Sequence, residues 1–534
     1  MTGHCRPPQT LVPRGSSRDR PHADRVLTLA WTVALLAGLA PFVARADGPA
    51  LIPWPRSVTP ADGAFKLTER MSIRYADASA ATATPLVKRL HLRREGTGAA
   101  IVLRVDPAAP TGAEGYRLIV GPTGIEVDAG TERGLFYGVQ TLLQLLPARC
   151  GSDCLLPAMT IDDAPRFAWR GLLVDISRHF FGPPTLRRII DEMAAHKLNV
   201  LHLHLTDDAG WRFEVPAYPK LTSIGARGDE DTPGKGRPRY LSRRDTRELV
   251  EYARARQVEI VPEIEFPTHC AAAARAYPEL FDGERAINPA HDASWALLKE
   301  VFAEAARQFP SSHLHFGGDE FSGESWERLP EVKRLREQAG LSGRRDVEAY
   351  FDNRLAQLIT RIGRRPMAWD EAAEAGAAPD VLIEWWRKGR PEILDAAVRS
   401  GHAVVMSPVD EIYLDYPQAL GEPGAPWEGN DNGPASVDKI VGWDPVPARF
   451  SADDARQVRG VEAALWTEFI RSERYLEFML FPRLFAVAEV AWRPAASGVV
   501  PDFNSRLKPD LERLRAAGVN ARRTASDATE YRTH

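Results

Sequence analysis

The chain is poor in cysteine and lacks the common nucleotide-binding motifs. It has four cysteines in 534 residues, and none of them shows the spacing of a structural zinc site. No Gly-x-Gly-x-x-Gly follows a predicted strand, and there is no phosphate-binding loop of the Gly-x-x-x-x-Gly-Lys-Ser/Thr type. The sequence therefore disfavours a zinc-stabilised fold and a dinucleotide- or nucleotide-binding enzyme.

The chain also lacks long runs of charge of one sign. Its formal net charge is −4, and charged residues make up 26% of it, as in ordinary globular proteins. A protein that binds nucleic acid usually concentrates lysine and arginine on one face or in one segment. No nucleic-acid partner is expected.

Long apolar runs are absent after the N-terminal region. Arg18, Arg20 and Arg25 precede an apolar run over residues 26–40, and Ala44-Arg45-Ala46 follows as a small-x-small cleavage site. The run is too short to span a bilayer comfortably. We therefore expect residues 1–46 to direct export, to the periplasm or the outside of the cell, and we expect no membrane span in the mature chain.

Export makes a disulfide feasible. Cys150 and Cys154 flank a three-residue loop and are expected to close it with a bridge, whereas Cys270 has no obvious partner and is expected to be a buried thiol.

At this length the chain is expected to contain more than one domain. Residues 47–165 contain alternating segments, 116–120 and 124–127, separated by Gly-Pro-Thr-Gly, which predicts a β-hairpin. Residues 134–146 carry apolar side chains at helical spacing. The pattern predicts a small α+β domain here, followed by a larger domain over 166–500 and a C-terminal helix and tail over 501–534.

The larger domain alternates short apolar strands with helices. Strands are predicted at residues 171–175, 200–205, 259–264, 313–316, 366–369, 381–386, 403–407 and 463–466. Helices are predicted between them, for example at 184–196, 244–256, 295–308 and 347–362. Eight strands that alternate with helices favour a (β/α)₈ TIM barrel, of the α/β class, over an open doubly wound sheet.

Polar and aromatic residues gather at the predicted carboxyl ends of these strands, where such barrels place their active sites. Among them, His315-Phe316-Gly317-Gly318-Asp319-Glu320 is the most informative segment, because its two glycines permit a sharp turn and present adjacent carboxylates. Acid catalysis on a glycosidic bond needs a carboxyl group whose pKa the pocket raises and a second group that stays ionised. Neighbouring residues on a strand point to opposite faces, so Asp319 and Glu320 are expected to be poorly placed to flank one bond as acid and nucleophile.

These segments strongly resemble glycoside hydrolase family 20, the β-N-acetylhexosaminidases. The similarity runs from Leu51 to Trp492 and includes the smaller domain. Its most specific parts are Arg170-Gly171, Ser177 to Phe180, Lys197 to Asn199, His204 to Asp208, Pro262-Glu263-Ile264 and His315 to Glu320. The resemblance implies a (β/α)₈ catalytic barrel that releases β-linked N-acetylhexosamine from a carbohydrate.

The resemblance also implies catalytic roles. Glu320 corresponds to the general acid/base, and Asp319 to the carboxylate that holds the 2-acetamido N–H and stabilises its developing positive charge. The acetamido carbonyl is then the nucleophile, which gives an oxazolinium intermediate and net retention. Asp207 and His269 correspond to a relay that sets the protonation of Glu320, since a neighbouring ionised carboxylate raises the pKa of an acid. Tyr413 corresponds to the donor to the acetamide oxygen.

Further residues correspond to the substrate-binding set of the family. Arg178 matches the clamp on the 3- and 4-hydroxyls, and Asp415 and Glu468 match acceptors for the 4- and 6-hydroxyls. Trp369, Trp386 and Trp466 match the walls around the acetamide methyl and the sugar face, with Trp385 an alternative to Trp386. Trp443 is expected on the leaving-group side. This interpretation requires no metal ion and no cofactor.

The chain departs from the family pattern near this site. Glu265, Phe266 and Thr268 replace the usual Asp, Met and Gly, Ala209 replaces a usual Gln, and Glu384 stands where Gln is common. None of these positions carries an assigned catalytic role, so the departures concern the shape of the pocket and its leaving-group preference.

Two alternatives belong to other functional classes. His202 and His204 lie two apart on one strand, as do His313 and His315, and with Asp207, Asp208 and His269 they could form a metal-dependent barrel hydrolase. A sugar-binding protein on an inactive hydrolase fold is the other alternative, although such a protein would be expected to lose the acid, and Glu320 is present.

Overall fold

The computed structural model describes residues 48–523 except 69–70, 96–97, 148–153, 284–285, 427–432 and 496–499. The expected export segment, residues 1–46, lies outside the described residues, as do residues 524–534 of the expected tail. In the part that is described, no helix is long and apolar enough to cross a membrane.

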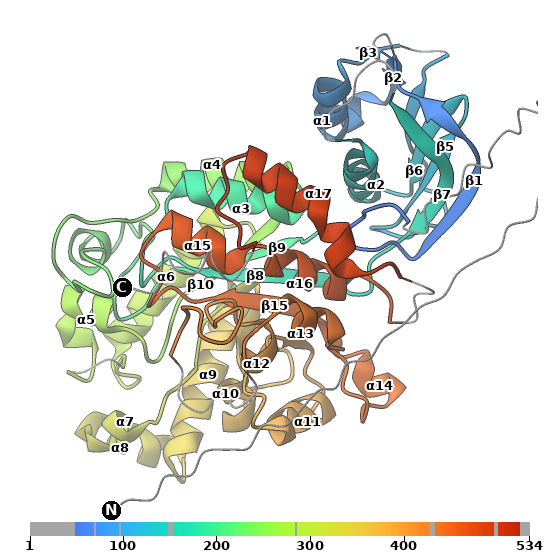
Figure 1. The fold of residues 1–534 in the computed structure, drawn as a ribbon. Helices are drawn as coiled ribbons and strands as arrows, with labels where there is room; N and C mark the ends of the chain where they lie inside the picture. Colours follow the sequence, from blue (N-terminus) through green and yellow to red (C-terminus); the bar gives the residue numbers. More distant parts are fainter. Residues whose placement is uncertain are drawn as a thin grey trace, which may run out of the picture. The chain divides into compact units, whose positions relative to one another are not determined.

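Residues 57–163 form a seven-stranded sheet with two helices (Figure 1). Its strand order is β1-β7-β5-β6-β4-β2-β3. The strands are β1 (Ser57–Lys66), β2 (Ser72–Arg74), β3 (Arg93–Arg94), β4 (Ile101–Val105), β5 (Tyr116–Gly121), β6 (Gly124–Ala129) and β7 (Leu155–Asp163), and the helices are α1 (Ala80–Leu90) and α2 (Glu132–Leu145). The predicted hairpin is confirmed, since β5 and β6 pair antiparallel from Tyr116–Ala129 to Gly121–Gly124.

The predicted disulfide falls in part on residues that are not described. Cys154 is disulfide-bonded, whereas Cys150 lies outside the described residues. Cys270 is a buried free thiol, and burial raises its pKa well above the ordinary value. Such a thiol is a poor nucleophile.

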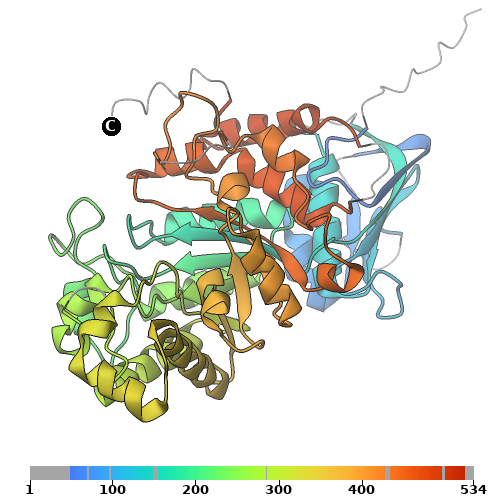
Figure 2. The ribbon, with the colours of Figure 1, turned by 90° about the horizontal axis from the view of Figure 1, so that it is seen from below.

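The rest of the chain forms a closed barrel of eight parallel strands, in the order β10-β11-β12-β13-β14-β15-β8-β9 (Figure 2). The strands are β8 (Trp169–Asp175), β9 (Val200–His204), β10 (Glu259–Glu263), β11 (His313–His315), β12 (Arg365–Trp369), β13 (Leu382–Trp385), β14 (Val404–Met406) and β15 (Val458–Leu465). The predicted (β/α)₈ barrel is therefore confirmed, and each predicted strand is found. Only the last begins well before its predicted start, because its first residues, Val458-Arg459-Gly460, do not form an apolar run.

Helices follow most of the strands and cover the outside of the barrel. They are α3 (Pro183–Ala195), α4 (Arg243–Arg254), α5 (Ala271–Ala276), α6 (Asp292–Gln308), α7 (Glu324–Arg328), α8 (Pro330–Ala339), α9 (Arg344–Arg361), α10 (Asp370–Ala375), α11 (Pro391–Arg399), α12 (Val409–Ile412), α13 (Val437–Gly442), α14 (Ala452–Ala455), α15 (Glu473–Leu480), α16 (Arg483–Trp492) and α17 (Phe503–Ala516). Local sequence sets their starts; Ser242 and Asp245, for instance, form a capping box at α4.

A buried ion pair joins the smaller domain to the barrel. The Lys197 ammonium donates to Asp163 at 2.9 Å, and Asp163 also accepts from the Tyr116 hydroxyl at 2.6 Å and from the Trp492 indole at 2.9 Å. The Lys197 side chain is 2% exposed and that of Asp163 is fully buried. Removal of one partner from such a pair leaves an uncompensated buried charge.

We expect Asp163→Asn to lower the free energy of unfolding by roughly 3–5 kcal/mol, because Lys197 would keep its charge without a counterion. A urea titration followed by intrinsic fluorescence measures the change. Asp162→Asn is the matched control, since Asp162 pairs with Arg117 at the surface and its loss should change stability little. Equal losses in the two variants would contradict the assigned role of the buried pair.

Candidate active site

The barrel places the side chains that follow its strands at one end. Arg178 follows β8, Asp207 follows β9 and His269 follows β10, while Asp319 and Glu320 follow β11. Trp369 is the last residue of β12, and the segments after β13, β14 and β15 contribute further aromatic and acidic residues: Trp386, Tyr413, Asp415, Trp466 and Glu468. The structure thus brings together eleven of the twelve residues that the sequence analysis nominates.

Five aromatic side chains form one cluster at this end of the barrel, and four of them are residues that the sequence analysis nominates, the fifth being Tyr416. Trp369, Tyr413 and Trp466 are buried, and Trp386 packs against them. The Trp386 and Tyr413 rings are stacked with centroids 6.5 Å apart, and the Trp369 and Trp466 rings are 6.0 Å apart. The ambiguity between neighbouring tryptophans is resolved, because Trp385 belongs to the main hydrophobic core instead. Aromatic faces of this kind suit an apolar methyl group or the face of a sugar ring.

Arg178 is held over this cluster by carboxylates. Its guanidinium lies 2.7 Å from Asp207 and 3.6 Å from Glu468, and it stacks over the Trp466 ring at 5.1 Å. Burial alone would lower its pKa, but the surrounding carboxylates outweigh burial and raise it well above the ordinary value. A fixed fork of donors at this place can bind a pair of adjacent hydroxyls.

Asp415 and Tyr413 come from the segment after β14. Tyr413 pairs with Ala464 of β15 in an isolated bridge, which fixes its backbone against the barrel, and Asp415 is 3% exposed. Burial raises the pKa of the Tyr413 hydroxyl well above 10, so it stays protonated and remains a hydrogen-bond donor.

Asp319 and Glu320 do not continue the strand, contrary to one of our premises. β11 ends at His315, and the chain then turns through Gly317 and Gly318, which both have positive φ. Glu320 itself has a φ of 55°, in the left-handed region that is uncommon for residues other than glycine. Strand alternation therefore does not set where these carboxylates point; the turn does.

His269 connects both carboxylates with Asp207. Its Nε2 lies 3.4 Å from Glu320 and 3.7 Å from Asp319, and its Nδ1 lies 3.5 Å from Asp207. Burial would lower the pKa of His269, but the charges of Asp207 and Asp319 raise it well above 6.5. His269 is therefore an imidazolium at neutral pH.

The pKa values of the two carboxyl groups are shifted in opposite directions. Contact with His269 lowers the pKa of Glu320, whose side chain is 61% exposed, whereas burial raises the pKa of Asp319. We expected a neighbouring carboxylate to raise the pKa of the acid Glu320; Asp207 acts in that direction, but the nearer cation outweighs it.

A layer of buried ionisable groups lies beneath these residues. The His204 ring bridges Glu263 at 2.6 Å and Asp207 at 3.2 Å. The His202 ring lies 2.6 Å from Glu462 and 3.4 Å from Glu263. A chain of charged contacts thus runs from the middle of the barrel to Glu320.

The sequence analysis treated these histidines only as metal ligands of an alternative function. The structure pairs His202 with Glu462 and Glu263, and His204 with Glu263 and Asp207. These carboxylates outweigh burial and raise the pKa of His204 to about 9 and that of His202 well above its ordinary value. His313 is not part of this layer, because its ring packs against Trp169 at the start of β8.

Glu371 is a site residue that the sequence analysis did not nominate. Its carboxylate accepts from the Trp386 indole at 3.1 Å, and Arg387 lies 3.4 Å from it. Burial, followed by the charge of Asp319, raises its pKa to about 7. The signal was present in the sequence, since Asp370-Glu371 directly follows Trp369, but an acidic pair at a strand end is also common at surfaces.

Trp443 is not brought to the site, and its expected place on the leaving-group side is wrong. It follows α13 and packs against the main hydrophobic core, not against the aromatic cluster. The adjacent Asp444 pairs with Arg166, which precedes β8, so this segment lies toward the opposite end of the barrel.

Comparison with known proteins agrees with this geometry. The catalytic domain of glycosyl hydrolase family 20 matches residues 167–495, and domain 2 of the same family matches residues 48–164. The chain belongs to glycosyl hydrolase family 20. It is accordingly a glycosidase, with the α+β domain that precedes the catalytic barrel in this family.

Its curated relatives include two β-hexosaminidases. The one from Porphyromonas gingivalis is 33% identical over 88% of this chain, which spans 64% of that protein's length. The one from Akkermansia muciniphila is 32% identical over 79% of this chain and 88% of the relative.

Solved structures of the family superpose well on this chain. An exo-β-N-acetylglucosaminidase from Vibrio harveyi, in complex with N-acetylglucosamine, is 29% identical, has a TM-score of 0.81 and covers 91% of this chain and 81% of its own. The N-acetyl-β-hexosaminidase from Streptomyces plicatus is 32% identical, has a TM-score of 0.78 and covers 89% of this chain and 97% of its own.

His269→Gln removes the imidazolium that holds the pKa of Glu320 down, so we expect the alkaline limb of the kcat/KM profile to move to higher pH. We also expect kcat at the optimum to fall on the order of 10²-fold, because Glu320 loses the group that positions it. His291→Gln, at an exposed histidine near Glu331, is the control. An unmoved limb would show that His269 does not set this pKa.

Proposed function

We propose that this chain is an exo-acting β-N-acetylhexosaminidase that releases non-reducing terminal N-acetylhexosamine with retention, through substrate-assisted catalysis. The observation that carries the proposal is the state of Asp319. Its Oδ1 is buried and accepts no hydrogen bond from any described residue, and Asp319 lies near enough to Tyr413 of the aromatic cluster for its charge to add to the effect of burial on the pKa of that hydroxyl. A 2-acetamido N–H supplies the donor that Oδ1 of Asp319 lacks, and a buried acceptor left without one is costly.

The first half of the reaction breaks the glycosidic bond. Glu320 gives its proton to the glycosidic oxygen while the acetamido carbonyl oxygen attacks the anomeric carbon, so that the leaving group departs as an alcohol. The positive charge that develops on the acetamido group lies next to the Asp319 carboxylate. An intramolecular nucleophile gains an effective molarity on the order of 10⁵ M or more.

The second half regenerates the protein. Glu320, now a carboxylate, takes a proton from water as the water oxygen attacks the anomeric carbon and opens the oxazolinium ring. Two displacements at one carbon give net retention. The lowered pKa of Glu320 keeps the group ionised, as this base step requires. For the acid step, a bound leaving group covers the exposed carboxyl from water, and such desolvation raises its pKa.

The remaining groups bind the sugar. Arg178 donates to the 3- and 4-hydroxyls, and Tyr413 donates to the acetamide oxygen. Trp369, Trp386 and Trp466 enclose the acetamide methyl and the ring face, and Asp415 and Glu468 accept from the 4- and 6-hydroxyls. The proximity of Arg178 to Glu468, 3.6 Å, and its stacking on Trp466 support their action on one ligand.

We also propose that the chain acts outside the cytoplasm, in the periplasm or after secretion. The apolar run 26–40 with its preceding arginines supports this, as does the disulfide at Cys154. Fractionation of cells that express the full chain, with immunodetection of the processed protein, tests the assignment. Retention of the unprocessed chain in the cytoplasm would contradict it.

We expect Glu320→Gln to lower kcat for p-nitrophenyl N-acetyl-β-glucosaminide by about 10²–10⁴-fold, since the general acid/base is removed. Asp319→Asn should lower kcat by about 10²–10³-fold through loss of charge stabilisation. A thiazoline mimic of the oxazolinium should inhibit the wild-type protein tightly.

Glu337→Gln, an exposed glutamate on α8, is the matched control for these variants. Hydrolysis of the plain β-glucoside at a similar rate, or activity indifferent to Asp319, would overturn the substrate-assisted mechanism. Loss of turnover on every aryl glycoside would favour the sugar-binding alternative.

A further inference from the structure

A second cavity adjoins Glu320 outside the aromatic cluster. It has a volume of about 240 Å³ and is lined by Glu320 itself, by Glu371 and by charged side chains of α9 and α10. None of the five clustered aromatic residues lines it. The volume lies a little below the range of about 300–1,000 Å³ that drug-sized ligands occupy, so the cavity suits a single sugar unit.

This cavity lies where the leaving group of the substrate is expected. The following inference rests on the proposed function, in which Glu320 protonates the glycosidic oxygen. The oxygen links the N-acetylhexosamine to the leaving group, so the leaving group must lie beside Glu320. A cavity that Glu320 lines is therefore where the next sugar of the substrate is received.

Two arginines at the edge of the cavity are exposed and could form an ion pair with a bound ligand. Arg344 and Arg345 begin α9, with side chains 43% and 70% exposed. Arg344 has one carboxylate within ion-pair distance among the described residues, Glu324 at 3.7 Å, and that side chain is itself 68% exposed. So weak a surface pair is easily exchanged for a better ligand.

The third arginine of the lining is already neutralised. Arg387 lies 3.1 Å from Asp370, 3.4 Å from Glu371 and 3.0 Å from Glu374. Glu374 in turn accepts from Arg345 at 3.2 Å and from Arg390 at 3.1 Å. Arg390 also pairs with Glu392, whereas Glu374 is the one carboxylate within ion-pair distance of Arg345 among the described residues, and Arg345 shares it with Arg387 and Arg390.

Two of the acidic residues of the lining add little negative charge. Burial raises the pKa of Glu348 to about 7, and burial followed by the charge of Asp319 raises that of Glu371 to about 7. Below neutral pH both groups are mostly protonated and uncharged. The cavity then presents the guanidinium groups of Arg344, Arg345 and Arg387 beside two neutral carboxyl groups and two whose pKa is lowered, Glu320 and Glu374.

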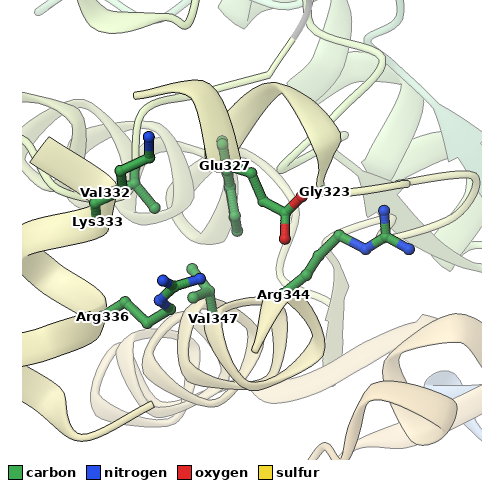
Figure 3. A pocket seen from close by; sticks show the side chains of 8 residues that line it. Gly323, Glu327, Val332, Lys333, Arg336, Arg344 and Val347 are labelled. Carbon is green, nitrogen blue, oxygen red and sulfur yellow. The ribbon is translucent and has the colours of Figure 1, made fainter. Parts of the chain in front are cut away.

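Arg344 is also held in place by its stem. Gly323 has a φ of 70°, and a Cβ added there would lie 2.5 Å from Cγ and 2.8 Å from Cδ of Arg344. The absence of a side chain at Gly323 therefore makes room for the arginine. Figure 3 shows Arg344 beside Gly323, with its guanidinium pointing away from Lys333 and Arg336. A side chain positioned in this way loses less conformational entropy when it binds.

We propose that this cavity is the subsite for a leaving-group sugar that bears a carboxylate, and that Arg344, assisted by Arg345, binds that carboxylate. Guanidinium and carboxylate form parallel charge-assisted hydrogen bonds of matching geometry. The carboxylate can belong to a uronic acid or to a carboxyalkyl ether on the sugar, which share this chemistry.

The test compares three disaccharides in which the same β-linked N-acetylglucosamine is joined to glucose, to glucuronic acid, or to a glucose with a lactyl ether. At pH 6 we expect kcat/KM for at least one acidic substrate to exceed that for the neutral one by roughly 10-fold or more, the usual effect of a hydrogen bond to a charged group. The acidic disaccharide with the larger kcat/KM shows whether the subsite prefers a uronic acid or a carboxyalkyl ether.

Arg344→Met keeps the apolar stem and removes the charge. We expect it to lower kcat/KM for the preferred acidic disaccharide about 10-fold, and to leave the neutral disaccharide and the p-nitrophenyl substrate unchanged. Arg361→Met, at the exposed far end of the same helix, is the matched control and should change none of the three.

Equal hydrolysis of acidic and neutral disaccharides, with the aryl substrate still cleaved, would overturn this inference and leave the proposed function intact. The same conclusion would follow if Arg344→Met lowered kcat/KM for all three substrates by the same factor. Failure of the wild-type protein to cleave the aryl substrate would overturn the proposed function and this inference together.

Discussion

The arrangement of the pocket depends on one buried carboxylate, that of Asp207. It is 3% exposed and lies 2.7 Å from Arg178, 3.2 Å from His204 and 3.5 Å from His269. The positive charge of Arg178 keeps the pKa of Asp207 well below its ordinary range in spite of burial, so it is ionised throughout the working range of a protein. Three cations are thereby held around one anion, and each of them points a different way.

The contacts of Asp207 with Arg178 and with His269 position two different parts of the site, the sugar-binding part and the acid/base part. Arg178 is fixed over Trp466, where a sugar would lie, and His269 is fixed against Asp319 and Glu320. Binding and proton transfer therefore share a common support. The turn through Gly317 and Gly318 completes it, because Glu265 occupies the space that a side chain at Gly317 would need.

Much of the fold follows from the sequence because the physical signals are local. The strands before Asp207 and Asp319 are short apolar runs that end in glycine or acidic residues, and a barrel brings such ends together whatever the lengths of the loops. The eleven nominated residues that meet there do so for this reason. The local sequence pattern does not predict the position of a side chain that lies in a long loop. Trp443 is an example, because it lies in the long segment between β14 and β15, in a different part of the barrel. The local pattern also fails for the directions in which the Glu320 and Asp319 pKa values shift, since these depend on the distance from Glu320 to His269 and on the burial of Asp319.

The buried layer of His202, His204, Glu263 and Glu462 replaces the branched apolar residues that usually fill such barrels. Burial opposes ionisation of Glu263, but the histidines outweigh it and lower its pKa, as Arg178 does for Asp207. The contribution of the ionised Glu263 and Asp207 carboxylates to the free energy of unfolding is therefore complete above the ordinary carboxyl pKa, about 4. It is lost only when the pH falls through their lowered pKa values.

The histidines set the upper pH limit of this stabilisation, as the carboxylates set the lower one. Carboxylates outweigh burial and raise the pKa of His204 to about 9, so its contribution is complete below the unfolded value, about 6.5, and fades as the pH rises towards 9. Thermal unfolding followed across pH would locate the two boundaries. In mildly acidic solution, between these two limits, the contributions of Glu263 and His204 to the stability of the barrel interior are both complete.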